Sequence, residues 1–312
     1  MKNASLNRLC ALGVLLTVCF APACRRDPPA EPRKTAIELL NEATDLTILS
    51  AALRKTKLAD TLQQRVGRYT FFAPNDSAFR SLPAPLNSAA SITALADNDP
   101  NVQTLYSVLR FHVLAGQFPV EGFQTGFNVN RTLPLRGGTD SLFFSKSVSR
   151  VFSVNGARIV KGNIQGTADG NFIHVVNKVI FPPTGDLLQT LAATSNLRIV
   201  MAALNRTGVA NGLRAPGIFT VFAPTDSAFT VTLRSLNPAV TDETSALSFV
   251  NNTLSGSSTP NTATLSNILL YHAAAGRYYS RAVAADSLRS LPTLLAGRTL
   301  SLTAPVRDIL NV

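Results

Sequence analysis

A motif that occurs twice is the feature that most constrains the fold of this chain. Tyr69–Phe79 reads YTFFAPNDSAF, and Phe219–Phe229 repeats it as FTVFAPTDSAF. The aspartates of the two copies lie 150 residues apart (226 − 76). A single copy would be a weak signal, but recurrence at this distance indicates two copies of one domain.

Each copy of the motif predicts a buried strand that turns into a helix. In the first copy the strand covers Thr70–Phe72 and stops at Pro74, because proline lacks the N–H that a sheet ladder needs. Asn75 is a good N-cap, and Asp76 would lie in the first helical turn, where the helix dipole favours a negative charge. The equivalent residues of the second copy are Thr220–Phe222, Pro224, Thr225 and Asp226.

The segments that flank the motif recur in the same order. Ala36–Leu53 has apolar residues at helical spacing and is followed by a second helical stretch, Thr56–Leu62; both recur within Leu187–Leu213. After the motif, Val102–Gly116 predicts an apolar helix that runs into a short strand, and Leu265–Gly276 is its counterpart. The sequence therefore predicts helices on both sides of each repeated strand.

The rest of the first copy predicts β-structure from Gly122 to Pro183. Leu142–Val154 is typical of a strand, Asn155-Gly156 of a hairpin turn, and Asn171–Phe181 alternates apolar and polar residues before a double proline. We therefore expect an α+β fold with a sheet in each domain.

The second copy follows the same path through Leu294–Leu302 and reaches Val312 at a point that corresponds roughly to the Asn155-Gly156 turn of the first. It has no counterpart of the Asn171–Phe181 strand, so we expect an incomplete, C-terminally truncated second domain with an unpaired edge. The predicted boundaries are 36–183 for the first domain and 186–312 for the second.

The first residues have the pattern of an export signal. Lys2 and Arg8 precede an apolar run, Leu9–Phe20, which is too short to span a membrane. Ala21–Cys24 resembles a bacterial lipobox, which would make Cys24 the lipid anchor; cleavage without lipidation is the alternative. We therefore predict a signal at 1–24 and a Pro- and Arg-rich flexible tether at 25–35.

Composition narrows the function classes. The net charge is +11, but the positive residues after the tether are scattered, which favours a basic solvated surface over a nucleic-acid site; anionic glycans or lipids are the other candidates. All three cysteines, Cys10, Cys19 and Cys24, precede the tether, so the mature domains hold no thiol for a disulfide or a zinc site. We predict no metal and no cofactor.

These motifs resemble the fasciclin domain family in tandem. Phe71–Phe79 and Val221–Phe229 match its first motif, and Tyr271-His272 matches its tyrosine–histidine motif, for which the first copy has Phe111-His112. Gly170–Pro183 matches the closing motif. The resemblance implies two domains, each a small β-sandwich packed against several helices, and a non-enzymatic role in adhesion.

The resemblance also suggests candidate partner-binding residues. In animal members the tyrosine–histidine motif and an Asp-Ile pair are linked to integrin binding; Tyr271 and His272 match the first, and Asn163-Ile164 stands where the second would be, without its carboxylate. The segment Arg277–Arg281 is a basic–aromatic patch suited to a sugar or an acidic partner. Its candidate residues are Arg277, Tyr278, Tyr279 and Arg281.

The remaining polar residues favour structural roles. His112 and His272 occupy equivalent places in the two copies, which favours a ring nitrogen bound to a buried backbone group over a metal or acid–base role. His174, Asp76 and Asp226 are also interpreted as structural. Ser77 and Ser227 follow the aspartates without a nucleophile elbow, so the sequence predicts no enzyme.

The sequence therefore predicts an exported protein, either a lipoprotein of the outer membrane or cell surface or, without lipidation, a secreted or periplasmic one. Its predicted role is adhesion through extracellular or cell-envelope protein or glycan partners, without nucleic acid. A carrier of a small apolar lipid or pigment is the alternative, and a hydrolase that uses His112 or His272 is a third hypothesis.

Overall fold

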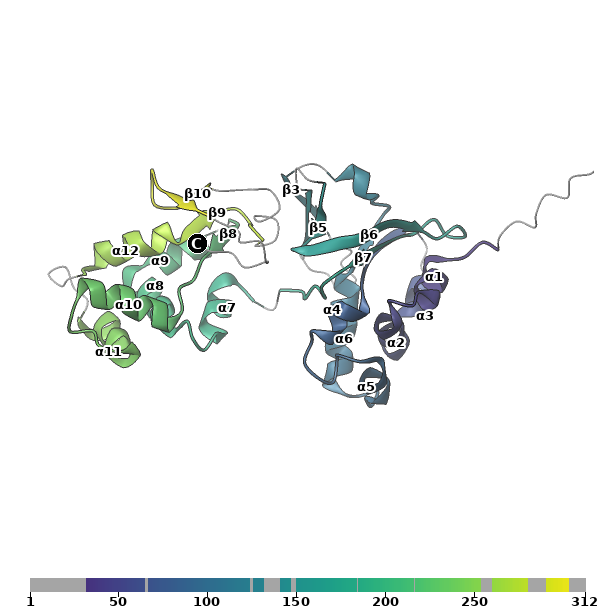
Figure 1. The fold of residues 1–312 in the computed structure, drawn as a ribbon, viewed down its shortest axis with the longest axis horizontal. Helices are drawn as coiled ribbons and strands as arrows, with labels where there is room; N and C mark the ends of the chain where they lie inside the picture. The colour runs from purple at the N-terminus through teal and green to yellow at the C-terminus, as the bar shows by residue number, and fades with distance from the viewer. Residues whose placement is uncertain are drawn as a thin grey trace, which may run out of the picture. The chain divides into compact units, whose positions relative to one another are not determined.

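The computed structural model describes residues 32–64, 67–123, 126–131, 141–146, 150–183, 185–215, 217–253, 260–279 and 290–302. The predicted export signal, its Cys24, most of the tether, and Arg281 lie outside these ranges. Each repeat contains helices and strands, shown in purple to teal for the first and in green to yellow for the second (Figure 1). The α+β class and the two repeated domains are confirmed.

Three short helices, not two, precede each repeated strand. The predicted stretch Ala36–Leu53 is broken at Ala43, and Thr35 begins its first helix with a capping box. The helices of the first domain are α1 (Ala36–Glu42), α2 (Thr47–Lys55), α3 (Leu58–Gln63), α4 (Asp76–Arg80), α5 (Ala89–Ala94) and α6 (Pro100–Phe111), with a 3-10 turn η1 at Val120–Gly122. Those of the second are α7 (Leu187–Ala193), α8 (Arg198–Thr207), α9 (Val209–Arg214), α10 (Asp226–Leu236), α11 (Glu243–Ser248) and α12 (Thr262–Tyr271), with a π-helical turn η2 at Phe249–Thr253.

The repeated aspartate explains why the predicted stretch Ala36–Leu53 is broken and a new helix, α2, begins within it. Leu46, at the N-cap of α2, makes no side-chain cap bond. Asp76 supplies the cap from the start of α4: its Oδ1 accepts the N–H of Ile48 at 2.9 Å and its Oδ2 the hydroxyl of Thr47 at 2.7 Å. The backbone N–H of Asp76 donates in turn to the carbonyl of Asp45 at 2.9 Å. The motif therefore joins two helix starts, one more than the sequence indicated.

The first domain contains a seven-stranded sheet in the order β2-β1-β7-β6-β5-β4-β3. At its centre β1 pairs antiparallel with β2 and parallel with β7. The strands are β1 (Tyr69–Pro74), β2 (Val113–Ala115), β3 (Gly126–Arg131), β4 (Ser141–Lys146), β5 (Phe152–Val154), β6 (Ala157–Gln165) and β7 (Phe172–Val176).

Strand β1 is buried on both faces, which explains its continuous apolar run. Phe71 belongs to the core between the sheet and the helices, whereas Phe72 belongs to a second core with Phe144 of β4. The Phe72 and Phe144 rings lie 5.4 Å apart although three strands separate β1 from β4 in the sheet. The predicted small sandwich is therefore one sheet curled over its own core.

The β-region predictions are partly confirmed. Asn155 and Gly156 form the β5–β6 hairpin turn with positive φ angles of 46° and 75°. The predicted strand Leu142–Val154 is two strands, β4 and β5, and the predicted strand Asn171–Phe181 ends at Val176. The latter ends early because the chain turns inward after Val176 and Ile180 donates its N–H to a buried histidine.

In the second domain, β8 (Phe219–Val221) pairs antiparallel with β9 (Ala273–Ala275), and β10 (Ser290–Pro292) pairs with β11 (Thr299–Ser301). The stretch Leu294–Leu302 is a turn followed by β11. Apolar side chains of α7–α12 form the main core. A smaller cluster joins Leu291, Leu300 and Leu302 to half-buried Phe222, Tyr271 and Tyr278.

Candidate binding site around Tyr271 and His272

His112 is the histidine of the repeat in the first domain. It follows α6 and is fully buried. Its Nδ1 donates to the carbonyl of Val108 at 2.7 Å, and its Nε2 accepts the N–H of Ile180 at 2.9 Å. Burial lowers the pKa of His112 from 6.5 to about 4, so the neutral ring ties α6 to the segment after β7. The predicted bond from a ring nitrogen to a buried backbone group is present.

His174 and Asn163 are linked in the same domain. His174, on β7, donates from Nε2 to the carbonyl of Phe118 at 2.7 Å and accepts the N–H of Asn163 on Nδ1 at 3.0 Å. Burial lowers the pKa of His174. Asn163 has a φ of 57° at an irregularity in β6, and its side chain binds the N–H of Val120 and the carboxylate of Glu121. Both residues stabilise the curled sheet.

His272, the counterpart of His112, lies in a different setting. Its Nδ1 bonds to the carbonyl of Ile268 at 2.7 Å, as in the first domain, but the side chain is only half-buried. Within the described residues, no bond reaches its Nε2. The ring instead lines an open pocket of about 720 Å³.

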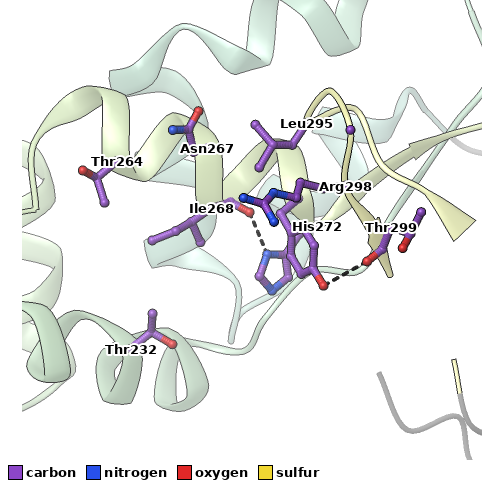
Figure 2. A pocket seen from close by; sticks show the side chains of 10 residues that line it. Thr232, Thr264, Asn267, Ile268, His272, Leu295, Arg298 and Thr299 are labelled. Carbon is purple, nitrogen blue, oxygen red and sulfur yellow. Dashed lines mark hydrogen bonds between the residues drawn. The ribbon is translucent and has the colours of Figure 1, made fainter. Parts of the chain in front are cut away.

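The pocket walls come from α10, α12 and the turn between β10 and β11 (Figure 2). Its rim combines the guanidinium of Arg298 and the amide of Asn267, both exposed, with half-buried Ile268 and Tyr271. Tyr271 donates its hydroxyl to the carbonyl of Thr299 at 3.1 Å. The remaining lining residues are Thr232, Thr264, Leu295 and Gly297. Such a mixed surface offers apolar contact together with hydrogen-bond donors.

The predicted partner-binding residues fall in different places. Tyr271 and His272 line the pocket, and Tyr278 packs in the small cluster with Tyr271 while its N–H binds Thr220 Oγ1 at 2.9 Å. Arg277 is exposed, and Tyr279 is half-buried, which raises the pKa of its hydroxyl. Asn163 and Ile164 are engaged inside the first domain, where Ile164 packs against the helical core.

Sequence reasoning missed several pocket residues. Thr264, Asn267 and Tyr271 recur at spacings of three and four residues along α12, so helical periodicity could have placed them on one face. Arg298 and Thr232 come from a turn and from another helix, and local sequence gave no signal for their proximity.

Groups of three or more His, Cys, Asp or Glu that could hold a metal are absent from the described part of the chain. Among the same residues, every helix is too short or too polar to cross a membrane.

Comparison with known proteins decides the family. The fasciclin domain model matches residues 44–182 and 195–311, which cover most of the chain. The chain belongs to the fasciclin family. It is similar to transforming growth factor-beta-induced protein ig-h3 of Oryctolagus cuniculus, with 26% identity over 207 residues, or 66% of this chain and 28% of the relative.

Bacterial relatives match a single domain. Protein sll1735 of Synechocystis is 30% identical over 144 residues, which cover 46% of this fasciclin chain and 95% of the relative. Immunogenic protein MPB70 of Mycobacterium bovis is 31% identical over 144 residues, or 45% of this chain and 64% of the relative. The chain spans under a third of the length of the Oryctolagus cuniculus ig-h3.

A solved structure of a FAS1 domain pair from the insect cell adhesion molecule fasciclin I is also similar. It is 14% identical, with a TM-score of 0.34, over 84% of this chain and 85% of that one.

Proposed function

We propose that this fasciclin protein is a non-enzymatic adhesion protein that recognises an extracellular or cell-envelope partner, protein or glycan, through its second domain. The observation that supports this most directly is the open pocket at Tyr271 and His272, whereas the equivalent His112 of the first domain is fully buried.

The charge of the pocket supports a polar or acidic partner. Among the described residues, the carboxylates that form ion pairs do so with other bases, and none pairs with Arg298. A guanidinium beside an aromatic ring and an amide suits carboxylates and sugar hydroxyls. The same polar rim makes the alternative, a carrier of a small apolar lipid or pigment, the weaker proposal.

The proposal includes export of the protein from the cell. The segment 1–24 has the pattern of a signal, and lipidation of Cys24 would hold the domains at a bacterial membrane surface. Mass spectrometry of the mature protein tests this part, because a diacyl or triacyl group on Cys24 supports the anchor and a first residue without acyl mass supports simple secretion.

The binding test presents purified mature protein to immobilised envelope glycans and matrix proteins. We expect saturable binding that Arg298→Ala lowers about tenfold or more, as at an interface hot spot. Arg158→Ala, which removes an exposed arginine of the first domain, is the matched control and should leave binding unchanged. Absence of binding to both panels, or equal losses in the two variants, would overturn the proposed site.

A further inference from the structure

A second pocket lies in the first domain and shares no lining residue with the pocket at His272. Its volume is about 490 Å³, which is within the usual range for ligand pockets. Its walls come from α1, α3, the segment before β1 and the turn between β6 and β7. We call it the Arg68 pocket, and its principal polar residues are Glu38, Gln63, Arg68, Asp169 and Asn171.

One buried hydroxyl beside this pocket lacks a hydrogen-bond partner. Tyr69, the first residue of β1, is 1% exposed, and its hydroxyl bonds to nothing among the described residues. Burial and then the nearby Asp169 carboxylate raise the pKa of that hydroxyl, while the Asn171 side chain lowers it. The hydroxyl therefore lies close to two residues of the pocket. Because buried hydroxyls nearly always have a partner, a ligand in the pocket can supply the missing bond.

The carboxylates of the pocket are held in place by backbone bonds. Asp169 accepts the N–H of Ala36 on Oδ2 at 3.0 Å and that of Asn171 on Oδ1 at 3.1 Å. Glu38 accepts the N–H of Thr35 on Oε2 at 2.7 Å, which lowers the pKa of Glu38. Carboxylate oxygens can accept more than one bond, so both groups can still receive a ligand hydroxyl. Acceptors that are already fixed lose little freedom when a ligand binds.

The guanidinium of Arg68 supplies donors of the opposite charge. It lies against Gly170, where a Cβ would come within 2.7 Å of Arg68 Nη1. Among the described residues it forms no ion pair with either carboxylate of the pocket. A ligand with a net charge of either sign would therefore meet a like charge here. Sugar hydroxyls both donate and accept, so a neutral sugar can bond to the guanidinium and to the carboxylates without such repulsion.

We propose that the Arg68 pocket binds a neutral sugar through the Tyr69 hydroxyl, the Asp169 carboxylate and the Arg68 guanidinium. The sugar is either a free ring or the end of a glycan chain, because both present the same hydroxyls. The site lies in the first domain, so the inference goes beyond the adhesion site proposed for the second domain and does not depend on it.

The test titrates isotopically labelled mature full-length protein with D-glucose, D-mannose and N-acetyl-D-glucosamine, each as the free sugar and as a trisaccharide. We expect at least one of them to shift the NMR signals of Tyr69, Gly170 and Asn171 in a saturable way. Tighter binding of the trisaccharide would identify a glycan chain as the ligand, and equal binding of the free sugar a single ring. Saturable shifts of these signals with none of the sugars would overturn the proposal.

Tyr69→Phe removes the hydroxyl and keeps the ring. It should weaken sugar binding about threefold to tenfold, as the loss of one hydrogen bond would. Because that hydroxyl has no partner within the described chain, the urea midpoint of the variant should stay the same or rise. Tyr106→Phe, at a half-buried tyrosine of α6 outside the pocket, is the matched control. A lower urea midpoint with unchanged sugar binding would show that the hydroxyl serves the fold, and would overturn the proposal.

The charges of the pocket are tested separately. Arg68→Ala should weaken sugar binding about tenfold, because the guanidinium is a charged donor, and Arg158→Ala, at an exposed arginine of the same domain, should not. Acetate and alanine serve as anionic and zwitterionic probes and should leave the bound sugar in place. Displacement of the sugar by either probe would overturn the assignment to a neutral ligand.

The variant Arg298→Ala separates this inference from the proposed function. It should bind the sugar as the unaltered protein does. Loss of sugar binding in Arg298→Ala would assign the sugar to the second domain and overturn the Arg68 pocket, while the proposed function stands. Sugar binding that depends on Arg68, together with no effect of Arg298→Ala on the glycan and matrix panels, would refute the adhesion site and support the Arg68 pocket.

Discussion

Strands β1 and β8 carry nearly the same sequence in two different surroundings. Thr70 and Thr220 make the same bond, from Oγ1 to the carbonyl of the glycine after the short strand, at 2.8 Å in both domains. However, β1 lies between two strands and is fully buried, whereas β8 pairs with β9 and is half-buried. The motif thus determines the local turn and its bonds, while burial depends on which distant segment lies beside it.

Amide exchange should show the largest difference between the two strands. Phe71 and Ala73 lie on the filled edge of β1, so their amides should open only with the domain. Val221 and Ala223 lie on the edge of β8 that faces away from β9, where the described residues place no strand, so their amides should exchange about a thousandfold faster or more. Exchange measured by NMR checks this, and Phe222, bonded to His272, is the internal control that should stay protected. Equal protection of Val221 and Phe71 would refute the comparison.

The two buried histidines of the first domain, His112 and His174, predict that its stability depends on pH. Because burial lowers the pKa of His112 to about 4 from 6.5, protons bind the unfolded chain more readily than the native one. The free energy of unfolding of the first domain should therefore be highest above pH 6.5. It should fall as the pH drops toward 4, by at most about 3 kcal/mol. Urea unfolding of the first domain at several pH values measures this loss.

A matched pair of variants isolates the contribution of His112 to this pH dependence. His112→Gln should flatten most of the pH dependence, while the part due to His174, whose pKa is also lowered, remains with the same sign. His272→Gln leaves both buried rings in place and should retain the slope. If His112→Gln unfolded with the slope of the unaltered protein, the titration would have to be assigned to other groups.

Local chemistry explains which parts of this fold could be predicted from the sequence. The strand-to-helix corner, the Asn155-Gly156 turn and the caps at Asn75 and Thr225 depend on neighbouring residues, and all are present. The cap that Asp76 gives to α2, the curl that brings Phe72 to Phe144, and the meeting of Arg298 with His272 depend on residues far apart in sequence. Periodicity does not report such distances.

The smallest predicted difference between the two domains is in the free energy of unfolding that their capping aspartates, Asp76 and Asp226, contribute. Asp226 binds the N–H of Ile199 at 2.8 Å, as Asp76 binds that of Ile48, so Asp226→Ala and Asp76→Ala should each cost about 2 kcal/mol through a lost helix cap. Only in the second domain does an arginine replace the threonine contact, since Arg198 Nε lies 2.8 Å from Asp226 Oδ2.

The presence of Arg198 in place of the threonine contact should change the free energy of unfolding only slightly. The Arg198 side chain is 58% exposed, so solvent screens its pair with Asp226, and Arg198→Ala should cost about 0.5 kcal/mol in urea unfolding. Thr47→Ala in the first domain is its counterpart and should cost about 1 kcal/mol, because the hydroxyl it removes bonds a buried carboxylate. A loss for Arg198→Ala as large as that for Asp226→Ala would show that the ion pair, and not the helix cap, is what the repeated aspartate contributes in the second domain.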